Sequence, residues 1–403
     1  MSGIEKIRKR SACIFAGISA MILYTLLIYI LKERVIPHQF QRSESEEIHL
    51  CMVVIGDLKL LHMVTSLKSL QYFNGAIRSP TNECPARHGA NVCYAPLRLH
   101  RNSIQLHILT DKQTQNSLRL ALQNEAFREI TVSIYLMDEY KHIVSWIPNR
   151  HSSGISALYK LLIPELLQNR TQKVIAFDAD TVFNDDILHL WKEFDCFNSK
   201  QIIGAAWEQY PDNFRDFGDL VRRTLSHTKD GNCLPIDEAT VPAGGINSGL
   251  VLWHLEHMRN VNWNALWKNS TREILGRQRF LRNSDQCVFS RVLSDNPHLY
   301  YELPCIWNVQ VWHPKAHKYC PVVWPDRQAE VEYCEDFKRS RVWSEIPALV
   351  HFNTSPKPYT NGSITKRNAT LSRTHQYLST EVIKQRFRET IHWFERIPSM
   401  CFH

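Results

Sequence analysis

Two carboxylates stand at the end of a short apolar run, in the stretch Val174-Ile-Ala-Phe-Asp-Ala-Asp-Thr-Val-Phe183. Asp178 and Asp180 are two positions apart, so on an extended chain their side chains point to the same side. Two like charges placed in this way repel each other unless a cation lies between them, and carboxylate oxygens suit Mg²⁺ or Mn²⁺. The pair therefore predicts a divalent metal site, with a solvated turn at the end of a strand as the alternative.

A second chemical alternative is a phosphatase. An apolar run followed by Asp-x-Asp and Thr-Val is also how the first motif of haloacid-dehalogenase-type phosphatases reads, with the first Asp as the nucleophile. Such enzymes need this strand early in the chain and a Gly-Asp-x-x-x-Asp downstream. The fragment Gly56-Asp57 lies upstream and has Leu61 in place of the second Asp, which argues against this reading.

The residues around the pair alternate between short apolar runs and helical patterns, which predicts an α/β fold with a mostly parallel sheet and right-handed crossovers. The expected strands span residues 48–55, 106–109, 130–135, 174–177, 202–207, 244–253 and 348–352. The expected helices span residues 60–72, 115–127, 156–167 (broken near Pro164), 188–194, 280–293 and 380–394. Ligands bind such sheets at the carboxyl ends of the strands, where Asp178 and Asp180 lie.

The composition is that of an ordinary globular protein, since 44% of the 403 residues are hydrophobic and 22% are charged. The length suffices for one large or two modest domains. The formal net charge of +8 is moderate and the sequence has no long basic run, so we expect no nucleic-acid partner.

Residues 12–31 form an uninterrupted, uncharged and largely apolar stretch, long enough to cross a bilayer as a helix. Lys and Arg residues precede it, which predicts a single-pass type II membrane protein. A cleaved signal peptide is the alternative, but Lys32 and Glu33 make a poor cleavage site. We therefore expect a cytosolic tail at 1–11, a signal anchor at 12–31, a stem at 32–47 and a luminal domain at 48–403, with a helical extension at 361–403.

Two features suit a luminal location. Glycosylation sequons follow the apolar stretch at Asn169, Asn269, Asn353, Asn361 and Asn368. Most of the 11 Cys also lie beyond it, as in a protein of an oxidising compartment.

The spacing of the Cys residues suggests disulfides rather than zinc ligands, because no C-x-x-C pair occurs. Cys84 and Cys93 bracket a loop-like insert that a disulfide would close. Cys305, Cys320 and Cys334 supply candidates for another pair, whose connectivity the sequence leaves open.

Four motifs resemble those of glycosyltransferase family 8. They are the apolar run with Asp178 and Asp180, Ile246-Asn-Ser-Gly-Leu-Val-Leu252, Ser284-Asp-Gln286 and His351-Phe-Asn-Thr-Ser-Pro-Lys-Pro-Tyr359. The resemblance spans roughly residues 48–385 and is closest to the xylosyltransferase domain of LARGE-type bifunctional glycosyltransferases, through residues 145–160 and 303–310. It implies a retaining, metal-dependent enzyme of the Rossmann-like GT-A fold. Such an enzyme would transfer a sugar, xylose in the closest members, from a UDP-sugar to a glycan or glycoprotein acceptor in the Golgi or ER.

The resemblance also implies which residues form the site. The implied metal ligands are Asp178, Asp180 and His351, for Mn²⁺ with Mg²⁺ as the alternative. The implied donor-binding residues are Ile55, Gly56, Asp57, Lys160, Asp178 and Lys357. The residues implied around the donor sugar are Asn247, Asp285 and Gln286, of which the adjacent Asp285 and Gln286 should face different ways on a helix.

Two mechanisms remain open. We favour front-face attack, in which the departing phosphate takes the acceptor's proton, because the amide of Gln286 is a poor nucleophile. Double displacement with Asp285 or Glu208 as the nucleophile is the alternative. Three further residues either form a surface on which an acceptor sugar stacks or belong to the core: Trp207, Trp307 and Trp312.

The sequence departs from the family at two places. Thr354 and Tyr359 stand where glycogenin-like members have Gly and Trp. LARGE enzymes also carry a second, glucuronosyl-adding domain outside the resemblance, so it does not imply polymerisation of a disaccharide. A lectin-like domain that binds glycans or assists another transferase is the non-enzymatic alternative, against which the complete metal-ligand set and Lys357 argue.

Overall fold

The computed structural model describes residues 47–76, 84, 102–167, 171–209, 245–324, 346–355, 357 and 377–402. The chain divides into two units, residues 1–46 and 47–403, and every described residue belongs to the second. The predicted tail and membrane span, nearly all of the stem, and residues 361–376 of the predicted extension lie outside the described residues. Within the described ranges, no helix is both long enough and apolar enough to cross a membrane.

Strands and helices alternate along the chain. The strands are β1 (Ile48–Val53), β2 (Ile104–Thr110), β3 (Ile130–Leu136), β4 (Lys173–Phe177), β5 (Thr181–Phe183), β6 (Ile203–Trp207), β7 (Ile246–His254), β8 (Tyr300–Glu302), β9 (Val309–Gln310) and β10 (Leu349–His351). The α-helices are α2 (Asp57–Phe73), α3 (Lys112–Leu122), α4 (Lys141–Val144), α5 (Ile163–Leu166), α6 (Ile187–Lys192), α8 (Leu255–Asn260), α9 (Trp263–Arg277), α10 (Ser284–Asp295) and α12 (Thr380–Arg396). Short 3-10 helices are η2 (Glu125–Phe127), η3 (Gly154–Leu162), η4 (Glu193–Cys196), η6 (Pro297–Leu299), η7 (Cys305–Asn308), η8 (Ala316–Lys318) and η10 (Ser399–Cys401).

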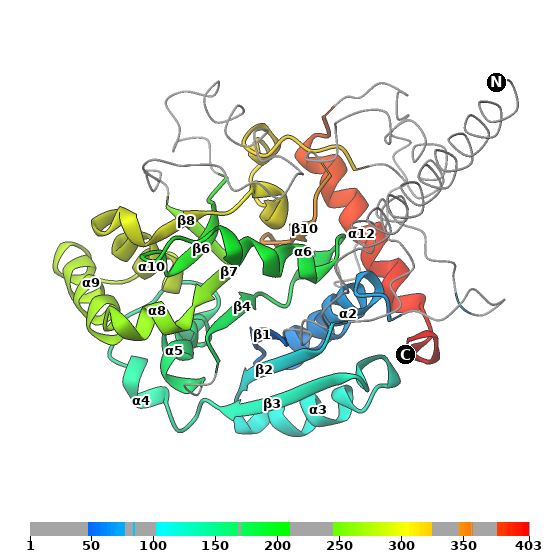
Figure 1. Ribbon diagram of the computed structural model, residues 1–403, viewed down its shortest axis with the longest axis horizontal. Helices are drawn as coiled ribbons and strands as arrows, with labels where there is room; N and C mark the ends of the chain where they lie inside the picture. The colour runs from blue at the N-terminus through cyan, green and yellow to red at the C-terminus, as the bar shows by residue number, and fades with distance from the viewer. Residues whose placement is uncertain are drawn as a thin grey trace, which may run out of the picture. The chain divides into compact units, whose positions relative to one another are not determined.

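The main sheet contains seven strands in the order β3-β2-β1-β4-β7-β6-β8 (Figure 1). β1 pairs in parallel with β2 and β4, and β2 pairs in parallel with β3. β7 runs antiparallel to both β4 and β6, so its first residues lie beside the carboxyl ends of those two strands. The predicted α/β fold with a mostly parallel sheet is confirmed, and β7 is its antiparallel strand.

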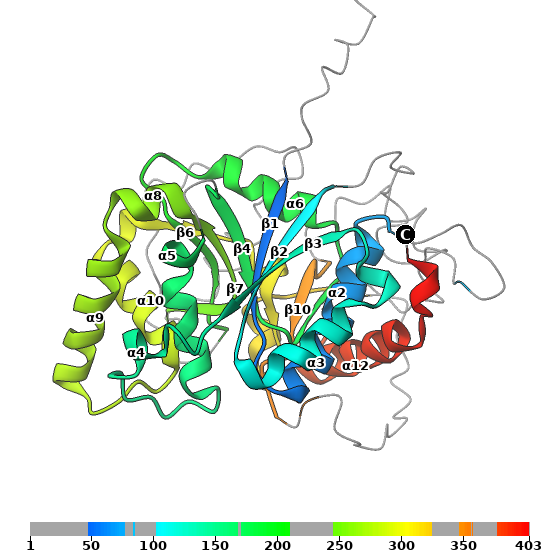
Figure 2. The same ribbon diagram turned by 90° about the horizontal axis from the view of Figure 1, so that it is seen from below.

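Side chains alternate along the strands and build an apolar core on each face of the sheet. On β1, Leu50 and Met52 belong to one core and Cys51 belongs to the other. Figure 2 shows α2, α3 and α12 on the first side and α5, α8, α9 and α10 on the second. Because both faces are covered, the strands read in the sequence as unbroken apolar runs.

Two of the predicted helices are interrupted, one next to a proline and one before a capping asparagine. The helix predicted at 156–167 is divided into η3 and α5, with Pro164 in the first turn of α5, where its missing N–H leaves no bond unmade. The helix predicted at 115–127 ends at Leu122, and Asn124 caps the separate turn η2 by accepting from the N–H of Ala126.

A second sheet of three strands, in the order β5-β10-β9, brings a late part of the chain to the Asp-x-Asp stretch. β10 runs antiparallel to β5, with His351 opposite Thr181, and parallel to β9, with His351 opposite Gln310. Since Thr181 directly follows Asp180, this pairing carries His351 to the end of β4.

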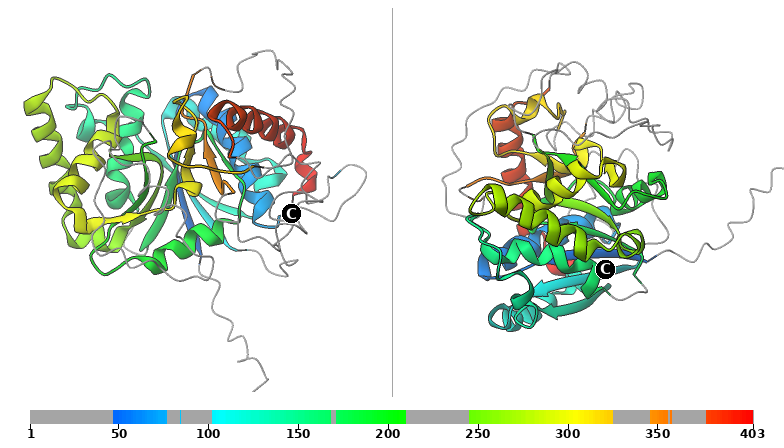
Figure 3. Two further views of the ribbon diagram at one scale, coloured as in Figure 1. Left: turned by 90° about the horizontal axis from the view of Figure 1, so that it is seen from above. Right: turned by 90° about the vertical axis from the view of Figure 1, so that its left-hand side faces the viewer.

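The structure corrects one predicted disulfide. Cys84 is bonded to Cys401, 317 positions later, and not to Cys93, which lies outside the described residues. Cys305 and Cys320 form another bond, one of the pairs that the sequence left open. Cys401 lies in η10, just after α12. Helix α12 lies beside α2 (Figure 3).

Candidate active site

Among the described residues, one group of His, Asp and Glu side chains lies close enough together to hold a metal ion: Asp178, Asp180 and His351. Their ligand atoms all lie within 4.8 Å of one another. Nε2 of His351 is 3.7 Å from Oδ2 of Asp178 and 3.6 Å from Oδ1 of Asp180. The three predicted metal ligands are thus brought together at one edge of the sheet.

The chemistry of this group fits a divalent cation. Two carboxylates and one imidazole are ligands that Mn²⁺ accepts. Asp180 is 5% exposed, and its Oδ1 has no hydrogen-bond partner within the described part of the chain. A buried carboxylate oxygen without a partner is costly, and a bound cation would satisfy it.

The imidazole of His351 is held from its far side. Nδ1 lies 3.2 Å from Oδ1 of Asn247, which also accepts from the N–H of Gly249 at 2.9 Å and from Nδ2 of Asn308 at 3.0 Å. An amide oxygen only accepts, so the hydrogen of the neutral imidazole lies on Nδ1. The lone pair of Nε2 therefore faces the two aspartates, as a metal ligand requires.

Lys160, predicted to bind the donor, is buried in η3 between two carboxylates. Its Nζ lies 2.7 Å from Oδ1 of Asp178 and 3.7 Å from Oδ2 of Asp285, and it donates to the carbonyl of Ser248 at 2.8 Å. Burial alone would lower the pKa of Lys160, but the charges of Asp178 and Asp285 raise it above its ordinary value. The ammonium therefore stays charged and joins the Asp-x-Asp stretch to α10.

Cations also keep both aspartates ionised. Burial would raise the pKa of Asp178, but Lys160 and Lys59 hold it below its ordinary value. Burial would likewise raise the pKa of Asp180, but Lys59 and Lys357 hold it well below that value. Lys357 donates to Oδ2 of Asp180 and, at 2.6 Å, to the carbonyl of Phe352. Positive side chains therefore surround the two carboxylates of the site.

Asp285 and Gln286 leave the first turn of α10 in different directions, as the helix geometry predicted. Asp285 faces Lys160, and burial raises its pKa to about 6 although the charge of Lys160 opposes the shift. Gln286 donates from Nε2 to Oε2 of Glu208 at 2.7 Å and accepts at Oε1 from the N–H of Ser248 at 3.3 Å. Both side chains are thus held at the start of β7.

The turn before these residues is strained. Ser284 has a φ of 50°, which a residue with a side chain rarely adopts. Its Oγ accepts from Nδ2 of Asn149 at 2.9 Å, and the same amide donates to the carbonyl of Gly154 at 2.6 Å. Asn149 therefore ties the start of α10 to the start of η3, which carries Lys160.

Glu208 is a buried carboxylate that accepts from three side chains. Oε2 accepts from Nδ2 of Asn247 at 2.8 Å and from Nε2 of Gln286 at 2.7 Å, and Oε1 accepts from Nε1 of Trp312 at 2.6 Å. Its own N–H donates to the carbonyl of Gly245 at 3.0 Å. Glu208 thus connects three of the residues singled out from the sequence.

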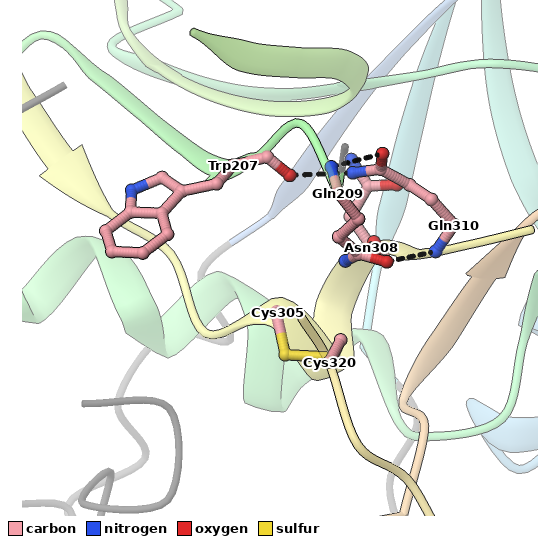
Figure 4. Close-up of a disulfide and its surroundings, with 6 residues drawn as sticks. All are labelled: Trp207, Gln209, Cys305, Asn308, Gln310 and Cys320. Carbon is pink, nitrogen blue, oxygen red and sulfur yellow. Dashed lines mark hydrogen bonds between the residues drawn. A yellow bond between two sulfur atoms is a disulfide. The ribbon is translucent and has the colours of Figure 1, made fainter. Parts of the chain in front are cut away.

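Two glutamines, Gln209 and Gln310, bind the backbone on either side of position 208, and Figure 4 shows their side chains. The N–H of Gln209 donates to Oε1 of Gln310 at 3.0 Å, and the N–H of Gln310 donates to Oε1 of Gln209 at 2.9 Å. Nε2 of Gln310 also donates to the carbonyl of Trp207 at 2.8 Å, whereas the Trp207 ring points away from the pair (Figure 4). This glutamine clasp, Gln209 with Gln310, fixes Glu208 between its two neighbours.

The remaining predicted residues are the segment that follows β1 and three tryptophans. Ile55, Gly56 and Asp57 follow β1, the parallel neighbour of β4, and Gly56 has the positive φ of 85° that permits the turn into α2. Trp307 is buried in the apolar core, whereas Trp207 and Trp312 are partly exposed. Of the three tryptophans, only these two keep a surface for stacking.

Sequence reasoning missed four residues that support the site: Asn149, Gly249, Asn308 and Lys59. Gly249 stands inside the motif Ile246-Asn-Ser-Gly-Leu-Val-Leu252, so its Gly was a visible signal. Asn149 and Asn308 lie inside the stretches 145–160 and 303–310 that carry the family resemblance, whereas Lys59 lies in none of the motifs, and each of the three acts on residues distant in the sequence.

Comparison with known proteins agrees with this geometry. A sequence model of glycosyl transferase family 8 matches residues 60–362. The chain is 33% identical over 219 residues to xylosyl- and glucuronyltransferase LARGE2 of Mus musculus, covering 54% of this chain and 30% of the relative. It is 34% identical over 275 residues to xylosyl- and glucuronyltransferase LARGE2s of Gallus gallus, covering 68% and 32%. The chain therefore spans about a third of the length of these curated relatives.

Two solved structures also resemble the chain. Mouse xyloside xylosyltransferase 1 in its apo form is 18% identical, with a TM-score of 0.48, and the match covers 76% of this chain and 98% of that one. Galactosyltransferase LgtC with donor and acceptor sugar analogues is 13% identical, with a TM-score of 0.48, and the match covers 86% and 96%. The sheet described above fits a GT-A-like fold, and the family match extends over well over half of the sequence. This chain belongs to glycosyl transferase family 8.

Proposed function

We propose that the chain is a metal-dependent, retaining glycosyltransferase that moves a sugar from a UDP-sugar to a glycan or glycoprotein acceptor. One observation carries the proposal: Asp178, Asp180 and His351 converge within 4.8 Å, with a buried carboxylate oxygen of Asp180 left without a partner in the described ranges. A Mn²⁺ ion held there, or Mg²⁺ in its place, would neutralise charge that builds on the diphosphate as UDP leaves.

The segment that follows β1 would supply part of the donor site. Ile55, Gly56 and Asp57 would line the uracil and ribose, because they follow the strand next to β4 and Gly56 leaves the backbone open to close approach. Lys357 would place its ammonium on the diphosphate. Lys160 would support the donor site indirectly, since its buried ammonium pairs with both Asp178 and Asp285.

Front-face attack is the mechanism that the side chains support. Gln286 is an amide whose two ends are both hydrogen-bonded, so it orients rather than attacks. Glu208 accepts from three donors, and Asp285 lies buried beside Lys160. Three donors already hold Glu208, and Asp285 is 3% exposed with Lys160 as its cation, so we propose that the departing phosphate takes the acceptor's proton.

Xylose is the donor sugar that we propose. The relatives named above are xylosyl- and glucuronyltransferases, and the solved relative from mouse is a xylosyltransferase. The acceptor would stack on Trp312 or Trp207, which remain partly exposed near Glu208.

We further propose a type II membrane protein of the Golgi or ER, with residues 12–31 as the anchor and residues 48–403 as the luminal domain. The uncharged stretch, the basic residues before it and the sequons after it support this topology. The disulfides Cys84–Cys401 and Cys305–Cys320 suit an oxidising compartment.

The function is tested by donor hydrolysis. The purified full-length chain would be given a panel of UDP-sugars with Mn²⁺ or with EDTA, beside Asp180→Ala, and UDP release would be measured. We expect release from UDP-xylose that needs Mn²⁺ and disappears in the variant. Release from another sugar alone would correct the donor. If no sugar releases UDP with or without candidate acceptors, the lectin-like alternative replaces the enzyme.

A further inference from the structure

Glu208 lies where three hydrogen-bond donors converge, and the direction of each bond is fixed by chemistry. A carboxylate only accepts, so the amides of Asn247 and Gln286 must both present nitrogen to it. Their oxygens then face the opposite way. Gln286 Oε1 accepts from the N–H of Ser248, and Asn247 Oδ1 accepts from the N–H of Gly249. Independent backbone donors thus agree with the orientation that Glu208 imposes.

The amide of Asn247 passes this orientation on to His351. With its nitrogen on Glu208, its oxygen lies 3.2 Å from Nδ1 of His351. That contact keeps the imidazole hydrogen on Nδ1 and leaves Nε2 facing Asp178 and Asp180. Glu208 therefore stands two hydrogen bonds away from a candidate metal ligand, and it holds the nitrogen end of the amide whose oxygen faces Nδ1 of His351.

We propose that Glu208 is a positioning residue that acts through Asn247 on His351, and so sets the metal affinity of the site. The proposal rests on the proposed function in one respect, that His351 is a metal ligand. Partners that orient a metal-bound histidine typically change metal affinity 10- to 100-fold when they are removed, and we expect about tenfold here. The same carboxylate holds Gln286 and Trp312, so the metal site and the acceptor side share one anchor.

The surroundings of Glu208 suit an anchor better than a nucleophile. Its flanking residues are fixed by the glutamine clasp, and its backbone N–H is bonded to Gly245. To attack a sugar, the carboxylate would have to release donors at 2.6–2.8 Å from both of its oxygens. A fixed, fully engaged side chain is what a hydrogen-bond relay requires.

The proposal is tested by Mn²⁺ binding to the purified full-length chain without nucleotide, measured by calorimetry. Glu208→Gln keeps the size of the side chain but replaces one acceptor oxygen by an NH₂ donor. The side chain can then no longer accept all three of its hydrogen bonds. We expect Mn²⁺ affinity to fall about tenfold. Glu193→Gln is the matched control, because Glu193 is a partly buried carboxylate that accepts from the hydroxyl of Tyr301 at 2.6 Å, in η4. It should bind Mn²⁺ as the unchanged chain does.

A double-mutant cycle separates a relay from general damage to the fold. Asn247→Ala removes the middle of the relay and should weaken Mn²⁺ binding to a similar extent. If Glu208 acts through Asn247, Glu208→Gln should add little further loss in the Asn247→Ala background. Additive losses would overturn the relay, as would a Glu208→Gln variant that binds Mn²⁺ normally. If Glu208→Gln does not fold, Glu208→Asp takes its place, because the shorter side chain withdraws the carboxylate from Asn247, and normal Mn²⁺ binding by that variant would overturn the relay.

This readout is independent of sugar transfer. Mn²⁺ affinity is measured without a donor sugar. A chain that transfers no sugar but whose Mn²⁺ affinity depends on Glu208 would contradict the proposed transferase and support the relay. The converse result, in which sugar transfer depends on Glu208 but Mn²⁺ affinity does not, would overturn the relay and leave Glu208 to act through Gln286 and Trp312 or as the nucleophile. An unchanged chain that binds no Mn²⁺ would overturn the relay as well.

Discussion

Gly249 lies directly against the imidazole of His351: a Cβ at this position would stand 2.0 Å from Cε1 and 2.1 Å from Nδ1 of the ring. Contacts under 3 Å are not tolerated, so any side chain at Gly249 must displace the histidine. The absence of a side chain here is therefore what allows His351 to face the two aspartates.

Replacing this glycine should damage the metal site specifically. We expect Gly249→Ala to lower Mn²⁺ affinity at least tenfold, because the ring must move away from Asp178 and Asp180. Gly276→Ala is the control, since a Cβ at Gly276 on α9 meets nothing within 4 Å. Calorimetry of both variants measures the effect, and equal affinities would show that the ring has room to adapt.

Lys160 should be a determinant of stability. It is 4% exposed and contacts both Asp178 and Asp285, so Lys160→Met would leave two acidic groups without their cation. Breaking a buried pair typically costs 3–5 kcal/mol, and we expect about 3 because Asp178 keeps some exposure. Denaturant unfolding in EDTA measures this loss. The exposed Lys112→Met serves as the control, and a matching small change in both variants would contradict the prediction.

Lys357 should have opposite effects on metal and nucleotide. Its ammonium is bonded to Asp180, so without nucleotide it competes with a cation for that carboxylate. We therefore expect Lys357→Ala to bind Mn²⁺ at least as tightly as the unchanged chain. With Mn²⁺ saturating, the same variant should bind UDP about tenfold more weakly, because one charge-assisted bond to phosphate is lost. Lys318→Ala, on the exposed surface of η8, should change neither affinity. Parallel losses of both ligands would mean that Lys357 only supports the fold.

The Cys84–Cys401 bond should stabilise the chain by about 2–5 kcal/mol, because it closes a very long loop of the unfolded chain. Lys68 also binds the C-terminal end of α12, because its ammonium donates to the carbonyl of Ile397 at 2.9 Å. Peptide mapping under non-reducing conditions checks the pairing directly. A fragment that links Cys84 to Cys93 would restore the pairing expected from the sequence.

The sequence predicts what depends on local pattern. The Asp-x-Asp stretch follows an apolar run, so both β4 and the position of its carboxylates were readable before the fold was known. His351 was identified through the family motif alone, since a single histidine after a short strand has no chemical signal of its own.

Long-range pairing explains what the sequence does not reveal. Glu208 contacts Asn247, Gln286 and Trp312 because β7 runs antiparallel between β4 and β6. The hydrophobic pattern of the sequence does not indicate the direction of a strand in its sheet. The Cys84–Cys401 pairing joins residues 317 positions apart, and Cys spacing favoured a nearer partner. Trp307 and Trp312 look alike in sequence, yet one is buried in the core and the other donates to Glu208.

The central claim is that Asp178, Asp180 and His351 hold a divalent cation to which a nucleotide diphosphate binds. Calorimetric titration of the full-length chain with UDP, in Mn²⁺ and again in EDTA, tests it most directly. We predict that UDP binds the original chain in Mn²⁺ but not in EDTA, and that the Asp180→Ala variant binds UDP in neither. UDP binding of equal strength in EDTA, or no binding in Mn²⁺, would contradict the account.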